Sequence, residues 1–295
     1  MGNIREKQIG ALGLCAFSVP AILFLPQTGW EPVLLVTVGS MLVVTFGKAV
    51  KGNECKLLSV PLMLWNILIM GKLAWEISVL YGTENPLPGL LLLLLGAYSV
   101  KKKASPVVGA VLSFFLIAIY SILYVFAVPN IEWSHLMPER ERSILGVSYG
   151  FLPLLLLYMY RGVGKKQRFL WTAIGSLLAL GAAVVTEGVG APDFYTAAKS
   201  VNLFGTMERL EPFVAAAVTA GGFCILSMLM NVNEILWKGV CGEKKNYPIE
   251  KIILPSMALC IIASRIPDEV WALGTTLCWG LIPILTQPIV CKKKF

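Results

Sequence analysis

Long apolar runs recur along this chain and constrain its fold more than any other feature. A helix that crosses a bilayer needs about 20 mostly apolar residues, because hydrocarbon offers no partner to a free backbone group. The sequence therefore predicts an all-α integral membrane protein of about ten transmembrane helices, of which the fourth and the ninth are short. The expected spans are residues 8–26, 32–50, 57–81, 87–100, 104–128, 143–160, 168–190, 212–235, 249–265 and 268–290.

The composition argues against a soluble domain. The 295 residues are 57% hydrophobic and 14% charged, with a mean hydropathy of +0.75, so too few charges are present to cover a soluble core. The net charge of +8 could suggest nucleic acid, but the basic residues lie in short clusters between apolar runs, so we expect no nucleic-acid partner.

Catalytic and metal-binding residue patterns are also missing from the sequence. The seven cysteines have no metal-ligand spacing, and His135 is the single histidine, so we expect no metal, no cofactor and no disulfide framework. No group of His, Cys or carboxylate residues is clustered for chemistry. We therefore expect that the protein is not an enzyme.

The distribution of Lys and Arg predicts the orientation in the membrane. If the N-terminus is cytoplasmic, nineteen of the 25 basic residues fall in cytoplasmic segments, and every such segment exceeds its outer neighbours. This is the positive-inside pattern, and it predicts cytoplasmic N- and C-termini. The outer segments hold Arg140, Arg142, Lys199, Arg209 and Arg265, and Lys72 lies inside a span.

The chain reads as one transmembrane domain, residues 1–295. The apolar run behind Arg5 and Lys7 has no small-residue cleavage site, so we expect a helix rather than a signal peptide. Ten spans divide into two halves of five, residues 1–128 and 143–290. Because five is odd, the second half would enter the membrane inverted, which gives many transporters an inverted repeat with broken helices.

Interrupted helices at the first position of each half are the best sequence indication of a ligand site in such folds. Proline removes one hydrogen bond of the first span and glycines weaken the sixth, so freed backbone groups there could hold a zwitterion such as an amino acid. An ordinary proline kink packed by neighbouring helices is the alternative. The candidate ligand-binding residues are Ser18, Val19 and Pro20 in the first span and Gly146, Ser148, Tyr149 and Gly150 in the sixth.

Charged residues within or beside the spans are further candidates, because charges in hydrocarbon are costly. Lys72 and Glu76 lie one turn apart in the third span, where they would form an intramembrane charge pair facing the interior; a structural pair near the outer end is the alternative. Arg209 and Glu211 open the eighth span. They are either a helix-eight motif that binds the preceding segment or a neighbouring helix, or residues at the rim of the membrane. The segment 188–208 before them reads as a short interfacial helix, a lid or a plain loop.

Several short motifs stand out along the chain. They are Lys7-Gln8 followed by residues 21–26; Lys72, Glu76 and Asn85-Pro86; residues 130–133 with Leu136 and Pro138; and Arg209-Leu210-Glu211 with Gly221, Phe223 and Ser227. These motifs resemble the spore germination permease family, the GerAB type, within the amino acid–polyamine–organocation superfamily. The similarity runs along most of the chain. The chain departs from the family pattern at Phe151, where a glutamate is common in helix six, and at Val218, where a tryptophan is common in helix eight.

The resemblance implies a fold and a role. It implies a leucine-transporter-like fold with ten helices, of which helices 1 and 6 are broken. It further implies the membrane subunit of a nutrient germinant receptor, which senses amino acids or similar small molecules at the spore inner membrane beside A-type and C-type subunits. The alternative is a proton-coupled amino-acid transporter on the same fold, because fold alone does not determine function.

Overall fold

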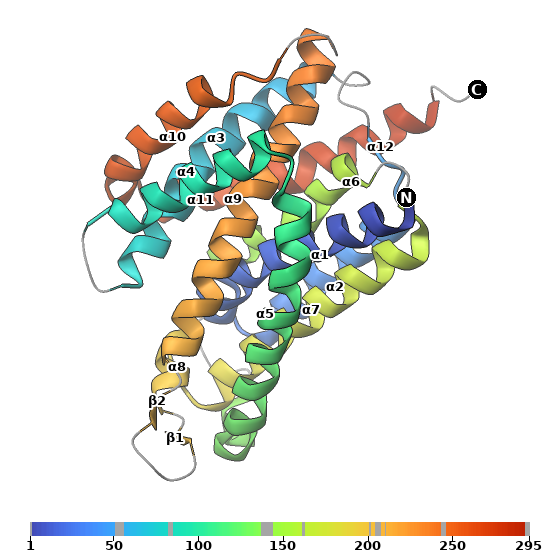
Figure 1. The fold of residues 1–295 in the computed structure, drawn as a ribbon. Helices are drawn as coiled ribbons and strands as arrows, with labels where there is room; N and C mark the ends of the chain where they lie inside the picture. Colours follow the sequence, from blue (N-terminus) through green and yellow to red (C-terminus); the bar gives the residue numbers. More distant parts are fainter. Residues whose placement is uncertain are drawn as a thin grey trace.

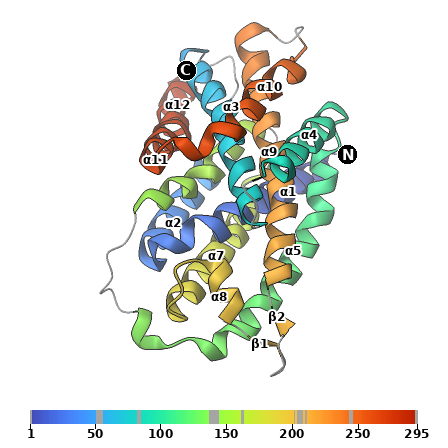
Figure 2. The same ribbon diagram turned by 90° about the vertical axis from the view of Figure 1, so that its left-hand side faces the viewer.

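The architecture is described from a computed structural model, which places residues 2–50, 56–81, 85–136, 144–160, 163–200, 202–203, 208–209, 211–242 and 246–292. Nearly all of these residues are helical, apart from a short antiparallel pair, β1 (Asn202–Leu203) with β2 (Glu208–Arg209). The helices form one bundle. The start of α1 and the end of α12 lie on the same side of it, away from β1 and β2 (Figures 1 and 2).

The helices follow the apolar runs of the sequence. A helical segment occupies each expected span, although several begin or end a few residues away from the expected limits. The segments are α1 (Gly2–Leu23), α2 (Trp30–Phe46), α3 (Lys56–Val79), α4 (Leu87–Lys101), α5 (Ser105–Ala127), η4 (Ile144–Leu155) with α6 (Leu156–Met159), α7 (Lys165–Gly188), α9 (Glu211–Cys241), α10 (Ile249–Ile262), and α11 (Asp268–Thr275) with η6 (Thr276–Leu281) and α12 (Ile282–Lys292).

Length and composition make the bundle compatible with a multi-pass membrane protein. Large apolar side chains are exposed over its surface, including Leu35, Phe114 and Leu177, which are 74%, 79% and 67% exposed. Soluble monomers rarely expose apolar surface on this scale. Among the described residues, five helices are long and apolar enough to cross a membrane: Lys56–Val79, Ser105–Asn130, Lys165–Gly188, Pro212–Cys241 and Asp268–Ile289.

Helix α1 lies at the centre of the bundle, where it packs against α5, α7 and α9. The expected break at Ser18–Pro20 is not seen, because the α-helix continues through Pro20 to Leu23 and then tightens into a 3₁₀ turn, η1 (Leu25–Thr28). Two side-chain hydrogen bonds involve Ser18, two residues before Pro20. Ser18 Oγ donates to the Cys15 carbonyl at 2.6 Å, and Tyr120 Oη donates to the Ser18 carbonyl at 2.9 Å. Helix α1 is packed on three sides by α5, α7 and α9, and membrane helices tolerate proline in such surroundings.

The sixth segment is irregular. Residues Ile144–Leu155 form a 3₁₀ helix, and only Leu156–Met159 is α-helical. Runs of 3₁₀ helix longer than three or four residues are uncommon, because the hydrogen bonds have poorer geometry. The glycine-weakened region expected in this span therefore coincides with non-α backbone.

Arg168 connects the C-terminal ends of α2 and α6. Its side chain is buried and donates to three backbone carbonyls: those of Gly47 at 2.8 Å, Val163 at 3.0 Å and Tyr160 at 3.1 Å. Gly47 follows α2, and Tyr160 follows α6. A cation there satisfies orphan carbonyls and complements the negative ends of both helix dipoles. This positively charged residue therefore has a structural role besides its place in the charge pattern.

The segment before α9 contains a short helix, α8 (Phe194–Ser200). Asp193 begins it by accepting hydrogen bonds from the backbone N–H and the hydroxyl of Thr196, which is the usual chemistry of a helix start. Phe194 is buried and packs edge-on against Tyr124 of α5. Of the readings considered for residues 188–208, the short helix is the one observed here.

Candidate functional site

A cluster of three charged side chains lies between α3 and the start of α11. Lys72 Nζ is 2.5 Å from a carboxylate oxygen of Glu76 and 2.9 Å from one of Asp268. The Lys72 side chain is only 7% exposed, whereas Glu76 is 27% and Asp268 is 74% exposed. The structure therefore brings Glu76 to Lys72 as expected, and it adds Asp268 from another helix. We refer to these residues as the Lys72 cluster.

Asp268 is the exposed member of the Lys72 cluster. It begins the helical stretch that continues through η6 to the end of α12. Because one ammonium faces two carboxylates, the cluster carries a net negative charge when all groups are ionised. A small cation, or the ammonium of a zwitterion, could bind at its exposed Asp268 side.

A second polar group is buried deeper in the bundle, where α3, α9 and η6 meet. Trp279 Nε1 donates to Asn66 Oδ1 at 2.8 Å, and Asn66 Nδ2 donates to Asn233 Oδ1 at 2.9 Å. Asn233 Nδ2 in turn donates to the Met63 carbonyl at 3.3 Å. The side chains of Asn66, Asn233 and Trp279 are fully buried. Polar contacts of this kind hold membrane helices together, and we call this group the asparagine network.

An aromatic stack joins the asparagine network to η4. The Tyr149 ring stacks on Phe24 with centroids 4.0 Å apart, and it meets Trp279 edge-on at 6.2 Å. Trp279 lies in η6, a stretch of π-helix. Helical π-turns are rare and often occur at functional sites. Two irregular helices, η4 and η6, thus pack against each other here.

Tyr149 belongs to η4, which packs against α11, the helix that begins at Asp268. The stack meets the asparagine network at Trp279, and the Lys72 cluster joins the same α3 to α11. These side chains come from η4, α3, α9, the α11–η6 stretch and Phe24, which lies between α1 and η1.

The first-span and sixth-span candidates come near each other at Phe24, whose N–H donates to the Pro20 carbonyl and whose ring stacks on Tyr149. Ser18 and Val19 face α9, where a Cβ at Gly221 would lie 2.1 Å from Ser18 Oγ and 3.0 Å from a Val19 methyl. Pro20 lies in the same helical segment, between Val19 and the η1 turn.

The sixth-span residues face other neighbours. Gly150 accepts a hydrogen bond from Ser40 Oγ at 3.0 Å, and Gly146 packs against the Phe24 carbonyl. Ser148 and Tyr149 are buried between them. The η4 segment that carries these residues also packs against α11, the helix that begins at Asp268. The Arg209 and Glu211 backbones belong to β2 and α9, and their side chains lie outside the described residues.

Sequence reasoning missed Asp268, Asn66, Asn233 and Trp279. Asp268 stood at the start of an expected span, where a carboxylate is common and gives no sign of a distant partner. The two buried asparagines carried a usable signal, because polar side chains inside spans usually face the bundle interior. The π-helical backbone of η6 had no such signal in the sequence.

Comparison with protein-family models and with curated proteins finds no match for this chain.

Proposed function

We propose that this chain is the membrane subunit of a nutrient germinant receptor of the GerAB type, and that it senses amino acids or similar small molecules. One observation carries the proposal beyond the motif resemblance. The partly exposed Lys72 cluster lies at the contact of α3 and α11, and α11 packs against the irregular η4 segment, so charged side chains and non-α backbone meet in one place. A small zwitterion needs a negative group and a positive group, and the Lys72 cluster contains both.

The proposed arrangement in the membrane follows from charge and geometry. We propose a multi-pass protein of the cell or spore inner membrane, with cytoplasmic termini and a five-plus-five inverted repeat of leucine-transporter type. The charge pattern supports this orientation. The start of α1 and the end of α12 lie on the same side of the bundle (Figure 1), as an even number of crossings requires. The Lys72 cluster would then face outward, where nutrients arrive.

We place the ligand beside Ser148, Tyr149 and Gly150, with its ammonium toward Asp268 and Glu76. Gly146 would shape the same surface from the first turn of η4. We propose an indirect role for Ser18, Val19 and Pro20. They would fix α1 against α9 and so position Phe24, on which Tyr149 stacks. Arg209 and Glu211 remain proposed contacts between the start of α9 and its neighbours.

Ligand binding can be tested on the purified protein with a panel of L-amino acids at millimolar concentration. A ligand at a hundred times its dissociation constant stabilises the folded state by about 2.7 kcal/mol, which thermal unfolding detects readily. We expect at least one small amino acid to raise the melting temperature of the wild type. Gly150→Leu should abolish this rise, because a Cβ there already lies 2.5 Å from a Val36 methyl and longer side chains would push η4 from α2.

Two further variants make this result specific. Asp268→Asn removes a 74% exposed carboxylate, so the protein should fold normally yet respond more weakly to the amino acid. Gly39→Leu is the control, because nothing lies within 4 Å of a Cβ at Gly39; its response should equal that of the wild type. An unchanged response in both Gly150→Leu and Asp268→Asn would place the ligand elsewhere.

The proposed partners are an A-type and a C-type receptor subunit in the surrounding bilayer. Genes for both subunits beside this one, and co-purification of the three proteins, would support the receptor. The second candidate is a proton-coupled amino-acid transporter. It is favoured by the buried polar groups that continue from the Lys72 cluster to the asparagine network. Uptake of labelled amino acid into vesicles that contain only this protein would select the transporter.

The orientation yields a prediction of its own. A membrane-impermeant maleimide added to intact cells should not label Cys241, which ends α9 on the proposed cytoplasmic side and is partly exposed. It should label a Ser134→Cys variant, because Ser134 is exposed on the proposed outer side. Labelling of Cys241 in intact cells would show that the number of crossings is odd or shifted.

A further inference from the structure

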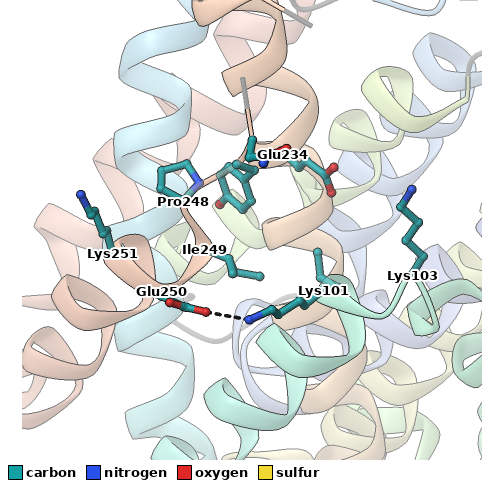
Figure 3. Close-up of a pocket in the computed structure, with 10 residues that line it drawn as sticks. Lys101, Lys103, Glu234, Pro248, Ile249, Glu250 and Lys251 are labelled. Carbon is teal, nitrogen blue, oxygen red and sulfur yellow. Dashed lines mark hydrogen bonds and ion pairs between the residues drawn. The ribbon is translucent and has the colours of Figure 1, made fainter. Parts of the chain in front are cut away.

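A polar pocket lies at the other end of the bundle, between the ends of α4 and α9 and the start of α10. Its volume is about 460 Å³, and Figure 3 shows its lining. The lining combines basic, acidic and phenolic groups from the α4–α5 turn, α9 and the segment that leads into α10. The residues used below are Lys101, Lys103, Glu234, Tyr247, Glu250 and Lys251. We call this the lysine pocket.

Both carboxylates of the lysine pocket already have cationic partners. Glu250 accepts from Lys101 Nζ at 2.7 Å, and Glu234 pairs with Lys238 one turn further along α9. Lys103 and Lys251 lie on opposite sides of the Lys101–Glu250 pair (Figure 3). Among the described residues, neither has a carboxylate partner. The described lining of the pocket therefore carries a net positive charge.

Two further features of the lysine pocket are the left-handed backbone of Lys103 and the hydroxyl of Tyr247. Lys103 has φ = 56°, a left-handed conformation that glycine usually occupies, yet a lysine stands at this point of the turn. The Tyr247 hydroxyl is buried near Asn233 and Glu234 without making a hydrogen bond of ordinary geometry. The phenol is protonated at physiological pH and can donate a hydrogen bond, and burial raises its pKa further. An oxygen-rich anion would complement these groups.

The surface beside the lysine pocket is apolar. Tyr98 and Leu95 on α4, and Leu254 on α10, are 63%, 54% and 63% exposed. They lie one or two turns from Lys101 and Glu250 along the same helices, in the direction of the proposed hydrocarbon. A soluble anion would gain nothing from this surface, whereas the acyl chains of a lipid would cover it.

We propose that the lysine pocket binds the phosphate headgroup of an anionic membrane lipid, whose acyl chains lie along the exposed faces of α4 and α10. Basic pockets between helices on the cytoplasmic side of membrane proteins suit such headgroups. The site lies at the opposite end of α3 from the Lys72 cluster and is independent of the proposed receptor function. The lipid would fasten α4 to α10 and to the end of α9.

The test compares the purified protein in nanodiscs of phosphatidylcholine alone and in nanodiscs with about one fifth phosphatidylglycerol. Thermal unfolding of the wild type should shift upward in the anionic discs. The double variant Lys103→Gln/Lys251→Gln should lose at least half of this shift, while its melting temperature in phosphatidylcholine stays near that of the wild type. Lys103→Arg/Lys251→Arg should restore the shift.

A matched control separates the pocket from general surface charge. Lys166→Gln removes an exposed positive charge from the start of α7, also on the proposed cytoplasmic side and outside the pocket, and it should keep the full shift. Equal losses in Lys166→Gln and the double variant would overturn the proposal. So would stabilisation of the protein in phosphatidylcholine discs by millimolar glycerol 3-phosphate that equals the lipid effect, because the ligand would then be a soluble phosphate.

Discussion

We expect the combined change Glu76→Gln/Asp268→Asn to destabilise the protein more than any other substitution in the Lys72 cluster. It leaves a 7% exposed ammonium without either carboxylate that now neutralises it. Removing the partner of a buried charge typically costs about 3–5 kcal/mol, because the remaining charge is desolvated without compensation. The measurement is chemical unfolding in detergent micelles, followed by circular dichroism.

The loss of stability caused by each single change should increase with the burial of the side chain that is replaced. Asp268→Asn should cost about 0–1 kcal/mol, since an exposed ion pair contributes little. Glu76→Gln should cost more, because Glu76 is only 27% exposed. Lys72→Met should also destabilise, since it leaves two carboxylates side by side. The cost of the double carboxylate change should exceed the sum of its two single costs, because each carboxylate partly substitutes for the other.

A rescue experiment identifies the cause. Adding Lys72→Met to Glu76→Gln/Asp268→Asn removes the uncompensated charge and should recover a substantial part of the lost stability. Similarly, Lys72→Met/Glu76→Gln should be less destabilised than the sum of its single changes. Strictly additive effects would mean that the three side chains act independently, and the cluster would then have no common electrostatic role.

The second large effect is expected where α1 meets α9. Gly221→Leu should prevent α1 from packing on α9, because even a Cβ would lie 2.1 Å from Ser18 Oγ and 3.1 Å from the Cys15 carbonyl. Small residues at membrane helix contacts allow this close approach. Overpacking of a core typically costs about 1–3 kcal/mol and sometimes more. Since α1 is the central helix, we expect little folded protein on size-exclusion chromatography.

Matched variants show whether the contact itself is responsible. Gly39→Leu introduces the same side chain at a glycine with open space around it, and it should leave the folded yield unchanged. Gly221→Ala is the milder test, and its cost should fall in a Ser18→Ala background, which removes the nearest atom. If Ser18→Ala gives no relief, the approach of α1 to α9 differs from the one described.

Features that depend on neighbouring residues could be predicted from the sequence. Hydropathy is a sum over about 20 consecutive residues, so the helical segments were located to within a few residues at most boundaries. The Lys72–Glu76 contact was predictable because residues four apart share a helix face. The weakness of the sixth span followed from Gly146, Gly150 and Pro153, and the structure gives 3₁₀ backbone there.

Features that depend on distant residues were decided only by the tertiary structure. Pro20 predicts a break in isolation, but in the bundle α1 packs against α5, α7 and α9 and continues through Pro20 to Leu23. Asp268 became a partner of Lys72 through the packing of α11 against α3. The asparagine network joins Asn66 to Asn233 and to Trp279, which are 167 and 213 positions further along the chain. Hydropathy and charge are local properties of the chain, whereas a hydrogen bond between helices depends on their rotation and distance, which the packing of the whole bundle determines.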